Sequence, residues 1–187
     1  MITRPRIAVI GVGNEFRRDD GVGWAVVGRL REDFAVLSSF ADVALAVCDG
    51  DPVRLIGLWE GADLAVVVDA AHAHPASPGR VHRLELDSGT AGRPSSTSSH
   101  GLGLGEAVEL ARILGRLPTR LIVYAVEGVD STYGPGLSPA VAAAVEPVAG
   151  SIEGEILRHG GAAGRGGGGG GESSGTGSEP AGGDDRP

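Results

Sequence analysis

The sequence has one cysteine, no lysine, few aromatic residues and no long hydrophobic run. A single cysteine, Cys48, excludes a disulfide framework, so a reducing compartment is expected. No segment approaches the roughly 20 consecutive apolar residues that a membrane-spanning helix needs. The first residues lack the apolar region of a secretory signal peptide. These absences predict a cytoplasmic protein that does not bind membranes. Because aromatic residues are only 4% of the chain, aliphatic side chains must fill its core.

Composition and net charge further restrict the class of protein. The formal net charge of -8 argues against non-specific binding to nucleic acid. Hydrophobic residues make up 41% and charged residues 21% of the 187 residues, which is typical of one globular domain. From residue 160 the composition changes to glycine-rich with almost no apolar residues. The sequence therefore predicts a folded domain over residues 1–159 and a disordered tail over residues 160–187.

Apolar runs alternate with segments of helical periodicity along the folded part. Uninterrupted apolar runs are typical of parallel strands covered on both faces. Residues 79–86 alternate instead, which predicts a half-exposed edge strand. The expected strands are 7–10, 43–48, 64–68, 79–86 and 120–126, and the expected helices are 21–32, 52–59, 102–114 and 138–156. This order predicts a single α/β domain with a twisted, mainly parallel sheet flanked by helices.

Three segments carry unusual chemistry. Asp19 and Asp20 follow a glycine turn and precede the first helix, Asp69 ends a buried strand, and His100 ends a Ser- and Gly-rich loop. In a doubly wound sheet the first two segments meet at the carboxyl edge, and the loop could bring His100 to them. Two carboxylates and one imidazole would form a site for zinc or nickel with positions left open for water or substrate.

Each of these residues also has a purely structural interpretation. Asp19 or Asp20 could cap the first helix. Asp69 could form a turn after its strand, and His100 could cap or begin the following helix. These alternatives stay open because the three segments lie far apart in the sequence.

Other motifs are weaker evidence for a functional site. Gly11 and Gly13 suggest a dinucleotide fingerprint, but Phe16 stands where the third glycine is required, and the two aspartates would repel a pyrophosphate. Ser98 and Ser99 adjoin His100, yet a serine nucleophile needs a spatially separate base. His72 and His74 are expected to be solvated, or else to join a metal shell. Cys48 is expected to be a small buried hydrophobe.

Taken together, the segments 11–14, 19–23, 67–70 and 99–104 resemble the hydrogenase maturation proteases. The strand at 121–126 with Glu127-Gly128, and the Gly136-Leu137-Ser138-Pro139 start of the last helix, are also similar to that family. The resemblance covers roughly residues 5 to 158. It implies an α/β fold of the phosphorylase/hydrolase-like type, with a twisted and mainly parallel sheet between helices.

The resemblance also implies a function. Members of this family are endopeptidases that remove a C-terminal extension from the large-subunit precursor of a [NiFe]-hydrogenase after nickel insertion. The family's metal-binding positions match Asp20, Asp69 and His100, with Asp20 standing where the best-known pattern has Glu. Asp19 is the weaker candidate. The implied metal is nickel supplied by the precursor, with zinc as another divalent ion for the same site. Asp20 and Asp69 are also the candidate catalytic residues, whether the hydrolysis is aspartic-type or metal-assisted.

Two other functions remain open from the sequence. The chain could be a nickel-sensing chaperone that binds the large-subunit precursor without cutting it. It could also be a nucleotide-binding α/β module. Precursor cleavage separates the protease from the chaperone, and nucleotide titration tests the third possibility.

Overall fold

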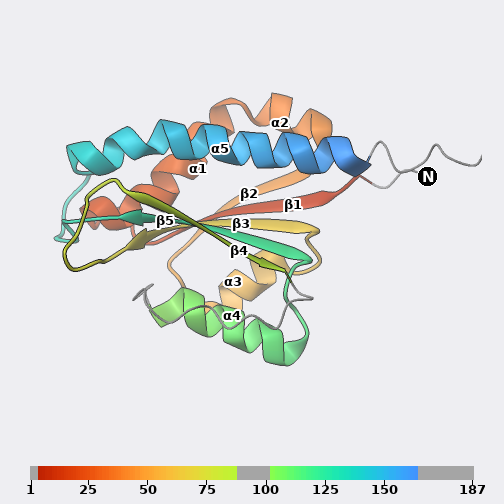
Figure 1. The fold of residues 1–187 in the computed structure, drawn as a ribbon, viewed down its shortest axis with the longest axis horizontal. Coiled ribbons are helices and arrows are strands. Elements are labelled where there is room, and N and C mark those ends of the chain that lie inside the picture. Colours follow the sequence, from red (N-terminus) through yellow and green to blue (C-terminus); the bar gives the residue numbers. More distant parts are fainter. Residues whose placement is uncertain (1–3, 88–101, 164–187) are drawn as a thin grey trace, which may run out of the picture.

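A computed structural model describes residues 4–87 and 102–163 (Figure 1). His100, Ser98 and Ser99 lie outside these residues, as does the predicted tail from residue 164 onward. The last helix runs to Ala163, four residues past the predicted end of the domain at residue 159.

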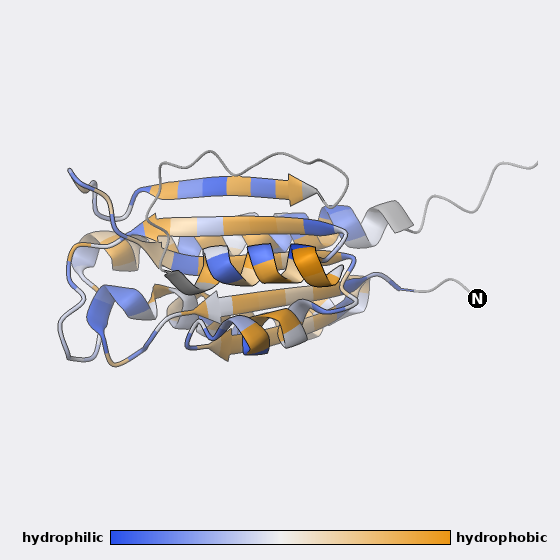
Figure 2. Ribbon diagram, turned by 90° about the horizontal axis from the view of Figure 1, so that it is seen from below, coloured by the Kyte–Doolittle hydropathy of each residue, from blue (hydrophilic) through white to orange (hydrophobic). Residues whose placement is uncertain are grey.

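A five-stranded sheet forms the centre of the fold, in the order β2-β1-β3-β5-β4. Four strands are parallel, and β4 pairs antiparallel with β5 at one edge. The strands are β1 (Arg6–Val12), β2 (Asp42–Cys48), β3 (Leu64–Ala71), β4 (Val81–Asp87) and β5 (Arg120–Glu127). The predicted mainly parallel sheet with a half-exposed edge strand is confirmed. Polar and apolar residues alternate along β4, while β3 is buried throughout (Figure 2). The antiparallel direction of β4 was not predicted.

Helices cover both faces of the sheet. They are a 3-10 turn η1 (Arg18–Gly21), α1 (Val22–Glu32), α2 (Phe34–Phe40), α3 (Pro52–Trp59), α4 (Leu102–Leu114) and α5 (Pro139–Ala163). Figure 1 shows α1, α2 and α5 on one face and α3 and α4 on the other. Each face has its own apolar core, which explains why the inner strands are apolar on both sides. In the described parts of the chain, no helix combines the length and apolar character needed to cross a bilayer.

Local sequence signals set several of these boundaries. The Asp51 carboxylate accepts the backbone N–H of Arg54 at 2.8 Å, and Pro52 occupies the first helical position, so α3 begins where its cap predicts. Gly61 then takes a left-handed φ of 71°, which ends the segment. The helix α2 was not predicted. Only Leu37 of its seven residues is buried, so it carries no apolar stripe that a periodicity search detects.

Candidate functional site

The glycine turn after β1 brings the backbone of β1 against the start of α1. A Cβ at Gly11 would lie 2.2 Å from the carbonyl oxygen of Gly23, and a Cβ at Gly13 would lie 2.0 Å from that of Asp20. Gly13 also has a φ of 119°, which favours glycine. The space over these glycines is thus filled by the chain's own backbone. This close approach explains why glycine is required at both positions. The two glycines therefore do not support a dinucleotide-binding site.

Asp20 lies half-buried in η1, directly before α1. Its Oδ2 accepts the backbone N–H of Asn14 at 2.9 Å, which ties the glycine turn to the 3-10 turn. Gly21 is the N-cap of α1, and no side chain caps either η1 or α1. The interpretation of Asp19 or Asp20 as a helix cap is therefore wrong.

Asp19 is buried, with 2% of its surface exposed. Its Oδ1 accepts the backbone N–H of Ser138 at 2.7 Å. Its Oδ2 accepts the backbone N–H groups of Val129 and Asp130 and the hydroxyl of Ser138, each at 3.0 Å. Burial raises the pKa of Asp19, but the N–H donors of Val129, Ser138 and Asp130 outweigh it and leave the pKa below its usual value. Four donors engage both oxygens, so Asp19 is a structural anchor.

Asp69 lies inside β3, two residues before its last residue, so it is not a turn residue, and that interpretation is wrong. Its register partner on β5 is Ala125. Only 6% of Asp69 is exposed. Burial is the main cause that raises its pKa to about 7, and the negative charge of Asp20 raises it further, against a lowering by the N–H of Ala70.

The structure thus brings Asp20 and Asp69 close enough for one charge to act on the other. Both belong to the carboxyl edge of the sheet, where ligands bind in open α/β folds. The helix α4 begins at Leu102, two residues after His100. The end of α4 is joined by a short connection to the first residue of β5, which lies at the amino edge of the sheet. The start of α4 therefore lies toward the opposite, carboxyl edge. Within the ranges 4–87 and 102–163, no group of three His, Cys, Asp or Glu residues could hold a metal ion.

The remaining candidate residues behave as expected. His72 and His74 are both exposed. Cys48 is buried among apolar side chains at the end of β2, and burial raises the pKa of its thiol. It is a small core residue, as predicted.

A further buried carboxylate at this edge was missed. Glu127 ends β5, is 4% exposed, and accepts the N–H of Ser77 at 2.6 Å. Its Oε1 lies 2.6 Å from Nε2 of His82. The N–H of Ser77 and the contact with His82 lower the pKa of Glu127. His82 is the register partner of Ala125, which is also the partner of Asp69, so the three positions lie side by side on adjacent strands. A glutamate directly after a buried strand was the available sequence signal.

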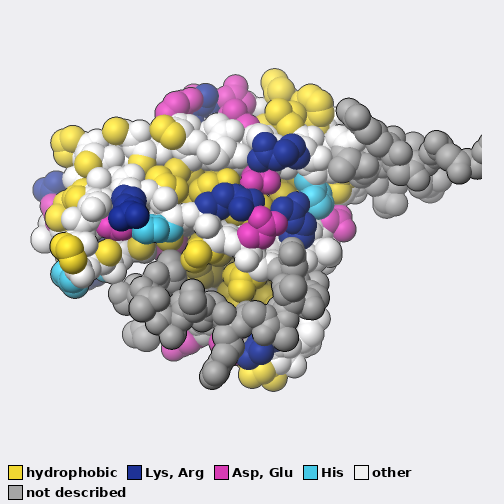
Figure 3. All heavy atoms as spheres, viewed as in Figure 1, with side chains coloured by type: hydrophobic (Ala, Val, Ile, Leu, Met, Phe, Trp, Pro, Cys, Tyr) yellow, Lys and Arg dark blue, Asp and Glu magenta, His cyan; other side chains and the backbone are white. Residues whose placement is uncertain are grey.

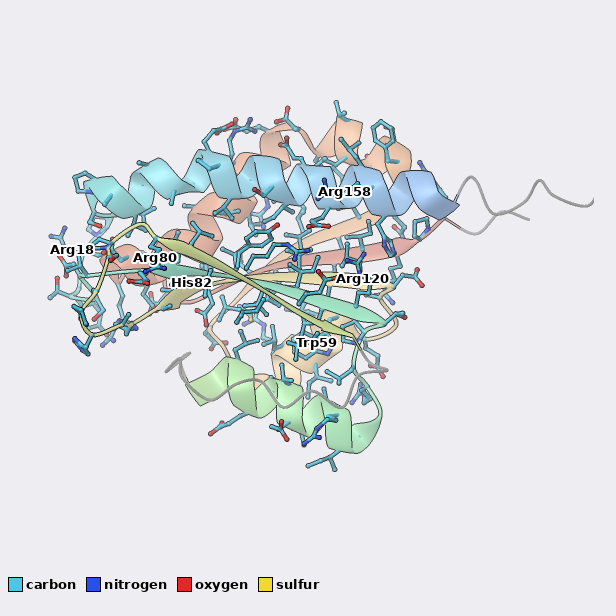
Figure 4. The ribbon with its side chains drawn as sticks, in the orientation of Figure 1. Arg18, Trp59, Arg80, His82, Arg120 and Arg158 are labelled. Atoms are coloured by element: carbon cyan, nitrogen blue, oxygen red, sulfur yellow. The ribbon has the colours of Figure 1, made fainter. Side chains whose placement is uncertain are left out.

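Charged residues away from this edge have a different role. Figure 3 shows a mixed cluster of basic and acidic side chains near the middle of one face. Arg83 of β4 donates to Glu155 of α5 at 2.9 Å, and Arg158 lies 3.2 Å from the same oxygen. In Figure 4, Arg18 and His82 lie toward one end of the sheet and Arg120 toward the other. This cluster joins the edge strand to α5 and is separate from the candidate site.

Comparison with known proteins gives the family. A family model described as hydrogenase maturation protease matches residues 31–155, a range that includes Asp69 and begins after Asp20. The hydrogenase 2 maturation protease of Escherichia coli K12 is 28% identical over 142 residues, covering 76% of this chain and 85% of that protein.

Solved structures agree. An Escherichia coli endopeptidase solved in solution superposes with a TM-score of 0.65 at 26% identity, covering 82% of this chain and 92% of that one. The hydrogenase maturating endopeptidase HybD from E. coli, at 24% identity and a TM-score of 0.62, shares the fold over 82% of this chain and 93% of its own. The protein is accordingly an endopeptidase. The chain belongs to the hydrogenase maturation protease family.

Proposed function

We propose that this endopeptidase removes a C-terminal extension from the large-subunit precursor of a [NiFe]-hydrogenase after nickel has been inserted. Family membership supports the processing of a hydrogenase. The observation that carries the proposal is the pair of Asp20 and Asp69 at the carboxyl edge, with Asp69 buried and its pKa raised to about 7. A carboxyl group with such a pKa is suited to acid–base work at neutral pH.

Asp69 is the proposed general base. Because its pKa is raised to about 7, both its protonated and its ionised forms are accessible near neutral pH. It accepts a proton from water while the water oxygen bonds to the scissile carbonyl carbon. It then returns that proton to the amine when the C–N bond breaks, which completes hydrolysis. Both ionisation states of Asp69 are therefore used within one cycle.

Nickel enters this proposal as part of the substrate. Two carboxylates held close together repel each other, and a divalent cation relieves that repulsion. Carboxylate oxygens together with an imidazole form a donor set that nickel or zinc accepts. Asp20, Asp69 and His100 are the proposed ligands. A carboxylate has two oxygens, so contact of one with the ion leaves the other to exchange a proton. The ion then acts as a checkpoint, because only a loaded precursor is positioned for cleavage.

Paired aspartate variants test the proposal. Asp20→Asn and Asp69→Asn are compared with Asp42→Asn, an exposed aspartate at the opposite end of β2. Cleavage of the nickel-loaded precursor is read by intact mass, and precursor binding is measured separately. We expect Asp69→Asn to abolish cleavage and retain binding, and Asp42→Asn to behave as wild type. Unchanged cleavage by Asp69→Asn would disprove the role of general base.

A further inference from the structure

We infer that Asp19 is a positioning residue that holds Asp20 in place relative to Asp69. The inference rests on the proposed function and concerns how that same site is maintained. Asp19 contributes no free oxygen to the site, because both of its carboxylate oxygens already accept hydrogen bonds from the loop between β5 and α5. Asp19 must therefore affect the reaction through the adjacent residue Asp20.

The donors around Asp19 require a carboxylate. Val129, Asp130 and Ser138 present three backbone N–H groups, and Ser138 adds its hydroxyl. An ionised carboxylate only accepts, so it satisfies all four donors. An asparagine of the same shape would turn an N–H₂ group toward at least one of them. Losing a partner leaves a buried donor unsatisfied, which costs more than the hydrogen bond itself contributes.

Backbone contacts reinforce the same junction. The N–H of Asp19 donates to the carbonyl of Asp130 at 3.0 Å, and the N–H of Arg18 donates to that of Gly134 at 3.1 Å. In return, the N–H of Gly134 donates to the carbonyl of Phe16 at 2.9 Å. Arg18 has a left-handed φ of 43°, a conformation that is unfavourable for a non-glycine residue. Such a conformation persists only where the surroundings hold it. Here Arg18 is held by its backbone bond to Gly134 and by an ion pair with Asp130 at 3.3 Å, beside the contacts of Asp19.

Displacement of this turn would move Asp20 directly. Asp20 is the next residue in the same 3-10 turn, and its N–H donates to the carbonyl of Arg17 at 3.0 Å. Its carboxylate is oriented by the N–H of Asn14. The amide of Asn14 makes no hydrogen bond to Asp19, so its protection reports the position of the Asp20 carboxylate. A misplacement of about 1 Å at a reacting group can reduce the rate by about 100-fold.

The test combines amide hydrogen exchange with steady-state kinetics. Asp19→Asn, Ser138→Ala and the control Asp42→Asn are studied at a temperature where circular dichroism shows each protein folded. For Asp19→Asn we expect exchange of the Asn14 amide to rise at least about tenfold. We also expect kcat for precursor cleavage to fall at least about tenfold with little change in KM. Ser138→Ala removes one donor of four and should shift both quantities in the same direction, but less.

A different result would overturn the inference. If folded Asp19→Asn kept wild-type exchange at Asn14 and wild-type kcat while losing only thermal stability, Asp19 would be a structural residue alone. If Asp19→Asn does not fold, Ser138→Ala decides: faster exchange at Asn14 supports the inference and unchanged exchange refutes it. If wild type itself cleaves no precursor, that failure counts against the proposed substrate. Faster exchange at Asn14 in Asp19→Asn would still support the positioning role, so the two failures are distinguishable.

Discussion

Replacing Asp69 by asparagine should stabilise the metal-free protein at alkaline pH while abolishing its activity. Asp69 is buried on β3, and burial, assisted by the charge of Asp20, raises its pKa from 3.8 to about 7. The folded protein therefore binds the Asp69 proton more tightly than the unfolded chain does. By linkage, the protonated group favours folding below pH 3.8, and that contribution is lost as the pH rises through 7.

The size of the effect follows from the two pKa values. Each tenfold change in proton affinity corresponds to about 1.4 kcal/mol. An ionised Asp69 should thus cost on the order of 4 kcal/mol of folding free energy at pH 8. Asparagine keeps an oxygen that can accept the N–H of Ala70 and carries no charge at any pH. The free energy of unfolding of the variant, minus that of wild type, should rise from near zero at pH 4 to several kcal/mol at pH 8.

Urea unfolding of chelator-treated protein at pH 4.5, 6 and 8 measures this difference, with Asp42→Asn as the exposed control. Titration of groups that do not interact with Asp69 is shared by both proteins and cancels in the comparison. The coupling between Asp69 and Asp20 contributes to the measured difference. If the profiles of wild type and Asp69→Asn ran parallel over this range, the carboxylate would not be destabilised in the folded state. Asp69 would then lack the raised pKa that suits a general base at neutral pH.

Three further predictions concern the scaffold. Gly11→Ala should reduce stability by about 3 kcal/mol, because its Cβ would lie 2.2 Å from the carbonyl oxygen of Gly23. Gly57→Ala should instead increase stability by about 0.5–1 kcal/mol, because no atom lies within 4 Å of the added Cβ. Equal effects of the two variants on Tm would contradict this packing. Asp51→Ala should cost about 1 kcal/mol in urea unfolding through loss of the α3 cap, and no loss would refute the capping role. Glu127→Gln should destabilise the protein at pH 7, and because the pKa of Glu127 is lowered, its Tm difference from wild type should shrink as the pH falls below 4.5.

The sequence was sufficient for the sheet because its signals are local. Val66, Val67 and Val68 form an unbroken apolar run, and such a run requires cover on both faces. The cap at Asp51 and the following proline likewise specify the start of α3 within a few residues. The helix α2 escaped prediction because its exposed Phe34 and Val36 dilute any helical stripe.

The site was predictable only in part, for a physical reason. The rule that ligands bind at the carboxyl edge placed Asp20 and Asp69 together. The role of Asp19 could not be predicted, because its partners Val129 and Ser138 lie 110 and 119 residues away in the chain. Asp19 and Asp20 are adjacent and chemically identical. Only tertiary contacts show that both oxygens of Asp19 accept hydrogen bonds, whereas the charge of Asp20 acts on Asp69.

The most direct measurement of the central claim is the cleavage of nickel-loaded and nickel-free large-subunit precursor by wild type and by His100→Ala, read by intact mass. We expect wild type to release a C-terminal peptide from the loaded precursor only, and His100→Ala to release none. Equal cleavage of both precursors by wild type, or full activity of His100→Ala, would contradict recognition of the metal through this site.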